Sequence, residues 1–446
     1  MSHDPTPGDA TPTTDGTVGE HLGACLRAVG ATRVFGAGSD GIVGIPGLGH
    51  VRVEEPALAA LLADAAGRLG PGPGVALLPG RRLRLSSVLG GVANEVVLGH
   101  VDEVAPAVAT WDLGRVHASV ELVLELDLEA PAPSTAEPLV YDPRSAGGAV
   151  TLDPALAEAR LAILAGPGVV RDGAVGQVAV VAERTGLPVL NTWGAKGLFR
   201  WDSPYHAGTA GLQAEDFALA GLAEAEIVLA IGVDPAEAPA ERWAGPQVLE
   251  VEPWQLDTLV LRWPDPGPPA PTGRNRLYES LAAALAGPYE SDAVPLSPAR
   301  AARDLAAAAN RGALVTADPG PAGLWVARAL PTTEPGSVVV PATRAPGAAL
   351  ALALVAGLDQ RTAFAVTTEP FDATTEALVQ LGLAWHSPTV VVAWGADVEL
   401  PAADAHLAAL RAARRDGGPQ LVGVPVALED TRLLVEVAGP VVAWSD

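Results

Sequence analysis

The sequence has very few residues of several types that would carry particular chemistries. Its 446 residues include one cysteine, Cys25, and one lysine, Lys196. A single cysteine excludes an internal disulfide framework and a thiolate metal cluster within one chain, and it is typical of a protein in the reducing cytoplasm. A single lysine means that any Schiff-base chemistry would depend on Lys196 alone.

Basic residues and long apolar runs are also scarce. The chain has 28 basic and 52 acidic residues, a formal net charge of −24. This charge repels both phosphate backbones and anionic membrane surfaces, so we expect neither nucleic acid nor a membrane as a partner. The longest apolar stretch, residues 347–358, is too short to cross a bilayer. Residues 1–16 lack the basic start and apolar run of a secretory signal and are predicted to be a disordered tail.

Regular patterns fill the rest of the chain, whose length corresponds to about three domains. In the first predicted domain, residues 17–130, helical spacing of apolar residues favours helices over residues 17–30 and 56–69. Strands are predicted over residues 33–35 and 75–78. The segment PAPSTAEP that follows this domain suits a linker.

The second predicted domain, residues 150–262, alternates strands with helices. LAILAG is followed by a turn and a helix and then by PVLNT, and the later segments EIVLAIGVD and QVLEVE are also strand-like. This alternation predicts a parallel sheet with helices on both faces. The Pro-rich and Gly-rich segment WPDPGPPAPTG then marks a second linker.

The third predicted domain, residues 298–446, repeats the same alternation. It opens with an Ala-rich helix over residues 298–310 and the strand ALVTAD, and it ends with the strand QLVGVP. The predicted fold class is therefore α/β, with three tandem doubly wound parallel-sheet domains.

Several of these segments resemble the thiamine-diphosphate enzymes, and acetolactate synthase in particular. TVGEHLGACLRAVGATRVFG resembles the first helix and strand of that family. LAILAGPGV, AERTGLPVLNTWGAKGLF, SPYHAGTAG and AEIVLAIGVD resemble its central domain almost segment by segment. ALVTADPGPAGLWVAR follows its diphosphate-binding domain in outline.

The resemblance implies a pyrimidine-binding first domain, a central domain and a diphosphate-binding third domain, the outer two shortened. It implies thiamine diphosphate and magnesium as cofactors, with Glu54 or Glu55 as the glutamate that hydrogen-bonds the pyrimidine. The cation would be held by an Asp in a GDG turn and a later Asn. Because the family site forms between subunits, the resemblance also implies a homodimer or a larger oligomer.

The sequence departs from the family pattern where these ligands are expected. Thr368, Glu369 and Pro370 stand where Gly, Asp and Gly would lie, and Trp394 and Gly395 stand where the Asn is expected. Thr and Pro cannot readily supply the backbone freedom of glycine, and Pro has no N–H to donate. Glu369 is the one oxygen ligand that remains as a candidate. In the first domain, PGRRLRLSS replaces a glycine-rich GPG turn.

Two further positions are candidates for binding or chemistry. Gly166 and Gly168 resemble half of a dinucleotide fingerprint, but Arg171 stands where a third glycine would permit close helix packing. Because some relatives bind flavin or ADP on the central domain, a nucleotide site stays open beside a purely structural turn. Lys196 and His206 fall in family-like turns, for which we expect a structural or hydrogen-bonding role.

Three hypotheses follow for the function. The first is an active thiamine-diphosphate-dependent decarboxylase or carboligase of 2-oxo acids. The second is a non-catalytic homologue with an eroded cofactor site, retained as a structural subunit or as a partner of an intact synthase. The third is a nucleotide-binding sensor that works through the central domain. The altered residues at 368–370, 394 and 395 favour the second hypothesis.

Overall fold

The computed structural model describes residues 16–38, 41–91, 93–114, 119–132, 159–243, 245–263, 268–416, 418–429 and 431–444. These residues form two compact units. Unit 1 covers most of residues 1–141, and unit 2 covers residues 142–446 together with the short segments 68–71 and 88–91. The predicted tail and most of the linker PAPSTAEP lie outside the described residues. No helix in the described part of the chain is long and apolar enough to cross a membrane.

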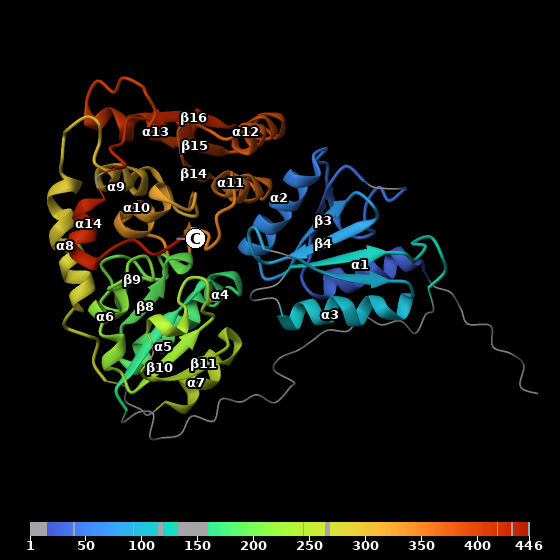
Figure 1. The fold of residues 1–446 in the computed structure, drawn as a ribbon, viewed down its shortest axis with the longest axis horizontal. Coiled ribbons are helices and arrows are strands. Elements are labelled where there is room, and N and C mark those ends of the chain that lie inside the picture. Colours follow the sequence, from blue (N-terminus) through green and yellow to red (C-terminus); the bar gives the residue numbers. More distant parts are fainter. Residues whose placement is uncertain are drawn as a thin grey trace, which may run out of the picture. The chain divides into compact units, whose positions relative to one another are not determined.

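Unit 1 is a mixed sheet with helices against it, and its strands follow the order β2-β1-β3-β4-β6-β5 (Figure 1). Thr17 begins the first helix with a capping box: its hydroxyl accepts the Glu20 N–H at 3.2 Å, and the Glu20 carboxylate accepts the Thr17 N–H at 2.8 Å. The elements are α1 (Val18–Ala28), β1 (Arg33–Phe35), β2 (Gly49–Val51), α2 (Pro56–Leu69), β3 (Gly74–Leu78), β4 (Arg82–Ser86), β5 (Ala93–Leu98), α3 (Val104–Gly114) and β6 (Ser119–Leu124).

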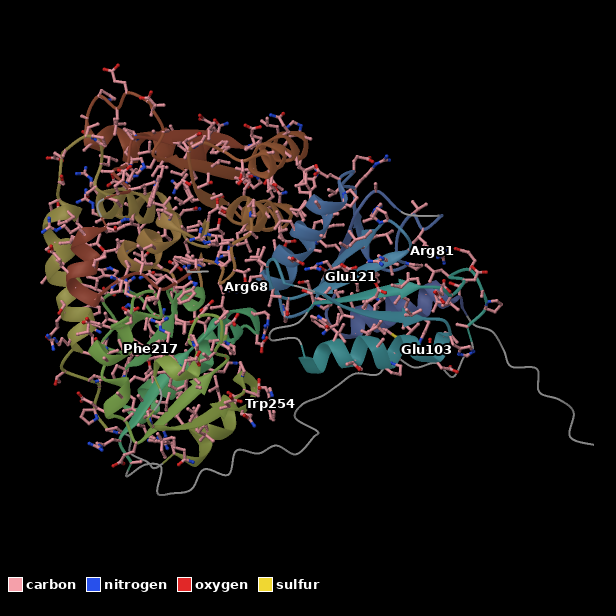
Figure 2. All side chains as sticks on the ribbon, viewed as in Figure 1. Arg68, Arg81, Glu103, Glu121, Phe217 and Trp254 are labelled. Atoms are coloured by element: carbon pink, nitrogen blue, oxygen red, sulfur yellow. The ribbon has the colours of Figure 1, made fainter. Side chains whose placement is uncertain are left out.

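Strand β4 is the main departure of unit 1 from a purely parallel sheet. It runs antiparallel to both β3 and β6, and the turn that leads into it places Gly80 at φ 75° and Arg81 at φ 55°. Its Arg84 is buried and binds the Asp64 carboxylate of α2 at 2.8 Å, while Glu121 of β6 lies 3.2 Å from Arg82 (Figure 2). The segment PGRRLRLSS, where the family resemblance expects a cofactor turn, thus forms a hairpin strand in the middle of the sheet.

The first sheet of unit 2 is wholly parallel, with strand order β11-β10-β7-β8-β9. Continuous apolar strands such as LAILA and IVLAI suit a sheet that is covered on both faces, because each strand then buries both sets of side chains. Its elements are β7 (Leu161–Ala165), α4 (Pro167–Arg171), α5 (Val175–Thr185), β8 (Val189–Thr192), β9 (His206–Ala210), α6 (Asp216–Leu219), β10 (Ile227–Ile231), β11 (Gln247–Val251) and α7 (Leu256–Arg262).

The second sheet of unit 2 is also parallel, with strand order β13-β12-β14-β15-β16. Helix α11 is apolar on all sides and buried along nearly its whole length, which is typical of a helix in the centre of a large core. The elements are α9 (Pro298–Ala308), β12 (Leu314–Ala317), α10 (Pro321–Ala329), β13 (Val338–Val339), α11 (Ala348–Leu358), β14 (Ala363–Thr368), α12 (Ala373–Trp385), β15 (Thr389–Trp394), α13 (Ala403–Asp416), β16 (Gln420–Val424) and α14 (Arg432–Ala438).

A helix that the sequence patterns did not single out joins the two sheets of unit 2. Helix α8 (Arg276–Tyr289) begins at Asn275, whose side chain accepts the Tyr278 N–H at 2.9 Å. It packs against β9 and α6 on one side and against α9 and α14 on the other, as its course along the edge of this unit shows (Figure 1). One continuous buried cluster therefore includes residues of both sheets. The predicted α/β class with three sheets flanked by helices is confirmed.

Candidate functional site

A cavity of about 220 Å³ lies at the carboxyl ends of β12 and β14, where the family resemblance expects the diphosphate. Parallel sheets bind ligands at this edge because the loops after the strands and the amino ends of the following helices meet there. The residues that line the cavity come from three loops: Asp318 and Pro319, then Arg344, Ala345, Pro346 and Gly347, and finally Thr367, Thr368, Pro370 and Asp372.

Carboxylates already occupy the helix ends that face this cavity. The Asp318 carboxylate accepts the Ala349 N–H in the first turn of α11 at 2.8 Å. The Asp372 carboxylate accepts the Thr375 N–H in the first turn of α12 at the same distance. Burial raises the pKa of Asp318 above its ordinary value, although the Ala349 N–H and the Thr367 hydroxyl favour the ionised form. Free N–H groups at a helix start attract phosphate, so these two carboxylates take the place of an anion.

The residues at the expected metal position do not fit a hard divalent cation. Glu369, the remaining candidate ligand, lies exposed, and its backbone N–H donates to the Trp394 carbonyl. Trp394 pairs with Thr368 across β14 and β15 and is completely buried, and an indole offers no oxygen ligand to a cation. Within the described residues, no group of three or more His, Cys, Asp or Glu side chains is placed to hold a metal ion. The residues present therefore match neither the diphosphate nor its cation.

Glu54 and Glu55, the candidates for the pyrimidine glutamate, lie at the start of α2 in unit 1. Both are exposed in that unit, and Glu54 pairs with Arg52, itself 75% exposed. The Glu55 carbonyl accepts the Ala59 N–H of the first helical turn. Both positions are therefore at a helix start in unit 1, and the role of either glutamate toward a pyrimidine stays a prediction.

Gly166 and Gly168 lie in the turn between β7 and α4, and both pack against the backbone of Gly232 at the end of β10. A Cβ at position 166 would come within 2.4 Å of the Gly232 oxygen, and one at position 168 within 2.9 Å of the Gly232 Cα. This close approach of two turns explains why glycine occupies both positions. Helix α4 itself has only five residues.

A buried carboxylic acid that sequence reasoning did not single out lies beside this turn. Glu237 is 1% exposed and accepts hydrogen bonds from the Thr192 hydroxyl and from the Gly194 N–H, the latter at 2.9 Å. Burial raises the pKa of Glu237 to about 8, and the nearby Asp234 charge adds to the increase. No local sequence signal marks Glu237, because its burial depends on the loops after β8 and β10 coming together.

A second, larger cavity of about 420 Å³ lies against helix α8 and contains the chain's lysine. Lys196, His206 and Arg328 supply its inner polar groups, and all three side chains are buried. Burial, together with a smaller contribution from the Arg328 charge, lowers the pKa of Lys196 to about 7. Burial likewise lowers the pKa of His206 to about 3, so that its imidazole is neutral at pH 7. The sequence predicted structural roles for Lys196 and His206, and the structure brings them together at one cavity.

Comparisons with known proteins point to one family for the central part of the chain. Residues 155–253 match the family model for the thiamine pyrophosphate enzyme central domain. A stretch of 93 residues is 41% identical to sulfoacetaldehyde acetyltransferase from Castellaniella defragrans; it makes up 20% of this chain and only 16% of that relative.

The fold of the whole chain is also similar to that of a solved structure. A candidate thiamin diphosphate-dependent enzyme from Mycobacterium smegmatis aligns with 92% of this chain and 99% of its own, with a TM-score of 0.63 and 16% sequence identity. That identity supports a shared fold and nothing finer. Residues 155–253 therefore match the central domain of the thiamine pyrophosphate enzymes in sequence, and the chain as a whole shares its fold with the solved structure.

Proposed function

We propose that this protein is a thiamine-diphosphate-enzyme homologue with an eroded cofactor site that works as a non-catalytic subunit. It would assemble as a homodimer or with an intact acetolactate-synthase-like subunit. The family match of residues 155–253 and the shared fold support descent from such enzymes. The residues at the carboxyl edge of the third sheet support the loss of cofactor binding.

The observation that carries the proposal is the position of Asp318. Its carboxylate accepts a hydrogen bond from the Ala349 N–H at the start of α11, and the Asp372 carboxylate accepts one from the Thr375 N–H at the start of α12. A diphosphate brought to this cavity would displace two carboxylates from helix N–H groups and meet their negative charge. Arg344, the cation of the cavity, donates its Nε–H to the Trp444 carbonyl at 3.0 Å.

Calorimetric titration of the full chain with thiamine diphosphate and Mg²⁺ tests the proposal. We expect no binding heat and no shift of the melting temperature at millimolar cofactor. A ligand present at 100 times its Kd would stabilise the fold by about 2.7 kcal/mol, which is readily measured. Stoichiometric binding would overturn the proposal in favour of an active decarboxylase or carboligase. Parallel titrations with FAD and ADP test the nucleotide-sensor hypothesis.

A variant that opens the two helix ends tests the physical reason for the proposal. We expect the double variant D318A/D372A to gain millimolar affinity for inorganic diphosphate, because the N–H groups of Ala349 and Thr375 become free. Glu376→Ala is the matched control, since Glu376 lies in the first turn of α12 but does not line the cavity. Equal affinity in the double variant and the control would show that the carboxylates do not exclude the anion.

A further inference from the structure

Lys196 lies in a buried loop after β8. The loop residues from Trp193 to Phe199 are all buried, and the Lys196 N–H donates to the Trp193 carbonyl at 3.1 Å. Gly197 follows with φ 82°, and a Cβ there would come within 2.6 Å of Thr332. Packing on both sides therefore fixes the direction in which the lysine side chain leaves the backbone.

The cavity that receives Lys196 has the size and lining of a small-molecule site. Its 420 Å³ fall in the range of about 300–1,000 Å³ that is usual for such sites. Leu281, Ala282, Leu285 and Ala286 of α8 form one apolar wall, and Leu330 also lines the cavity. Among the lining residues, Ala282, Ala286 and Glu290 are exposed, so the cavity opens to solvent along α8.

The charged groups around Lys196 leave its amine without a partner. Arg328 pairs with Asp216, both fully buried, and at the rim Arg303 pairs with Glu290 at 2.8 Å. Within the described residues, no hydrogen bond or ion pair engages the Lys196 amine, and the His206 Nδ1 also has no hydrogen-bond partner. His206 is neutral at pH 7. The Arg274 guanidinium carbon lies 4.6 Å from the centre of the Tyr278 ring, and Arg274 is not among the residues that line the cavity.

We propose that Lys196 is a nucleophile that captures a small apolar aldehyde in this cavity as an imine. The Nζ lone pair attacks the carbonyl carbon, and the carbonyl electron pair moves to oxygen, which takes up a proton. Loss of water from the carbinolamine then leaves a C=N bond, so one aldehyde and one amine give one imine and one water. The step needs no oxidant or reductant.

Two features of the cavity suit this chemistry. A desolvated lysine beside another cation keeps a large fraction of its amine unprotonated near neutral pH, which is the form that attacks a carbonyl. The apolar wall of α8 favours an alkyl or aryl chain over a polar one, because burying that chain releases it from water. The site is separate from the cavity near Asp318, and the inference does not depend on the function proposed above.

Reductive trapping with hexanal tests the proposal on the full chain. Hexanal and borohydride at pH 7 should add one hexyl group to each chain, located at Lys196 by peptide mapping and mass spectrometry. Because the chain has a single lysine, the N-terminal amine is the other amine that must be separated. We expect the trapping rate to rise with pH around a midpoint near pH 7.

The matched control is the double variant K196R/R432K, which moves the lysine to a position where the side chain is 87% exposed. An ordinary lysine has a pKa of about 10.4, so fewer than about one in a thousand of its amines are unprotonated at pH 7. We expect trapping at Lys196 to be at least tenfold faster than trapping at position 432. Equal rates would overturn the proposal, as would labelling confined to the N-terminal amine.

A second pair of variants tests the cavity itself. Ala282→Trp should fill the cavity from α8 and reduce hexanal trapping at least tenfold, whereas Ala283→Trp lies on the same helix outside the lining and should leave it unchanged. Both positions are exposed, so both variants are expected to fold, which circular dichroism verifies. Unchanged trapping in Ala282→Trp would show that the aldehyde does not bind in the cavity.

Discussion

Arg328 of α10 connects the two sheets of unit 2 through a fully buried set of polar contacts. Its Nε–H donates to the Gln213 side chain at 3.1 Å, one terminal N–H donates to the Thr209 carbonyl at 2.6 Å, and another pairs with Asp216. A buried charge is tolerated only when it is paired and hydrogen-bonded. Arg328 meets that condition, because each of its three guanidinium nitrogens has a partner.

Breaking this pair is expected to destabilise unit 2 strongly. Asp216→Leu should lower the free energy of unfolding by about 3–5 kcal/mol, because it leaves the Arg328 charge buried and unpaired. Urea denaturation followed by circular dichroism measures the change. The double variant D216L/R328M should recover most of the loss, since both charges are then gone; a double variant as unstable as the single one would contradict this account.

Asp304 makes a similar connection between α9 and α13, and it carries a pH dependence. It is 1% exposed and binds Arg300 and His406, each at 3.2 Å. Burial opposes its ionised form, but hydrogen bonding to His406 and the charges of Arg300 and Arg303 prevail and lower the pKa of Asp304 below its ordinary value. Its contribution to stability is therefore fully present above the unfolded pKa of about 3.9 and is lost as the pH falls below it.

Asp304→Asn should accordingly cost about 3 kcal/mol at pH 7 and progressively less as the pH falls below about 4. Urea midpoints of the wild type and the variant between pH 3 and pH 7 measure the difference. Asp292→Asn is the control, because Asp292 binds the same Arg300 but is 88% exposed, and it should change stability by less than about 1 kcal/mol. A cost for Asp304→Asn that does not vary with pH would contradict the assignment.

At the scale of elements, the turn between β7 and α4 depends on its close packing against the end of β10. Gly166→Ala would place a methyl group 2.4 Å from the Gly232 oxygen, an overpacking that typically costs about 1–3 kcal/mol. Gly176→Ala, within α5 and with open space around its Cβ, should instead stabilise the protein by up to about 1 kcal/mol. Melting temperatures of the two variants should move in opposite directions, and a harmless Gly166→Ala would refute the packing explanation.

The elements themselves followed from local patterns in most of the chain. The helix over residues 56–69 and the strand over residues 33–35 have the predicted bounds, and α11 lies within the longest apolar run. Helix α8 was not predicted, because it directly follows the Pro-rich linker and the third domain was predicted to begin only at residue 298. Strand β4 was interpreted as an altered turn, although RLRLS alternates polar and apolar residues; its place in the sheet comes from antiparallel pairing with β3 and β6.

At the scale of the whole molecule, the proposed dimer must form against strong like-charge repulsion. Two copies that each carry a net charge of −24 repel one another. At 0.1 M ionic strength, salt largely screens the repulsion between exposed charges that are more than about 10 Å apart. We therefore expect light scattering to show twice the mass of one chain, with a dimer fraction that rises as salt increases from about 0.02 to 0.3 M. A monomer at all salt concentrations would contradict the homodimer, and a dimer that dissociates in salt would contradict the electrostatic argument.

The sequence by itself determined the α/β class, the three successive sheets and the residues at 368–370 and 394 that depart from the family pattern, because periodicity and motif spacing are local properties of a chain. Only the tertiary structure decided which groups meet. Asp318 reaches the start of α11 from a different loop, and Lys196 lines one cavity with residues of α8, which lie in a distant part of the sequence. Burial and pairing set the charge of a group, and both depend on contacts between segments that no local pattern contains.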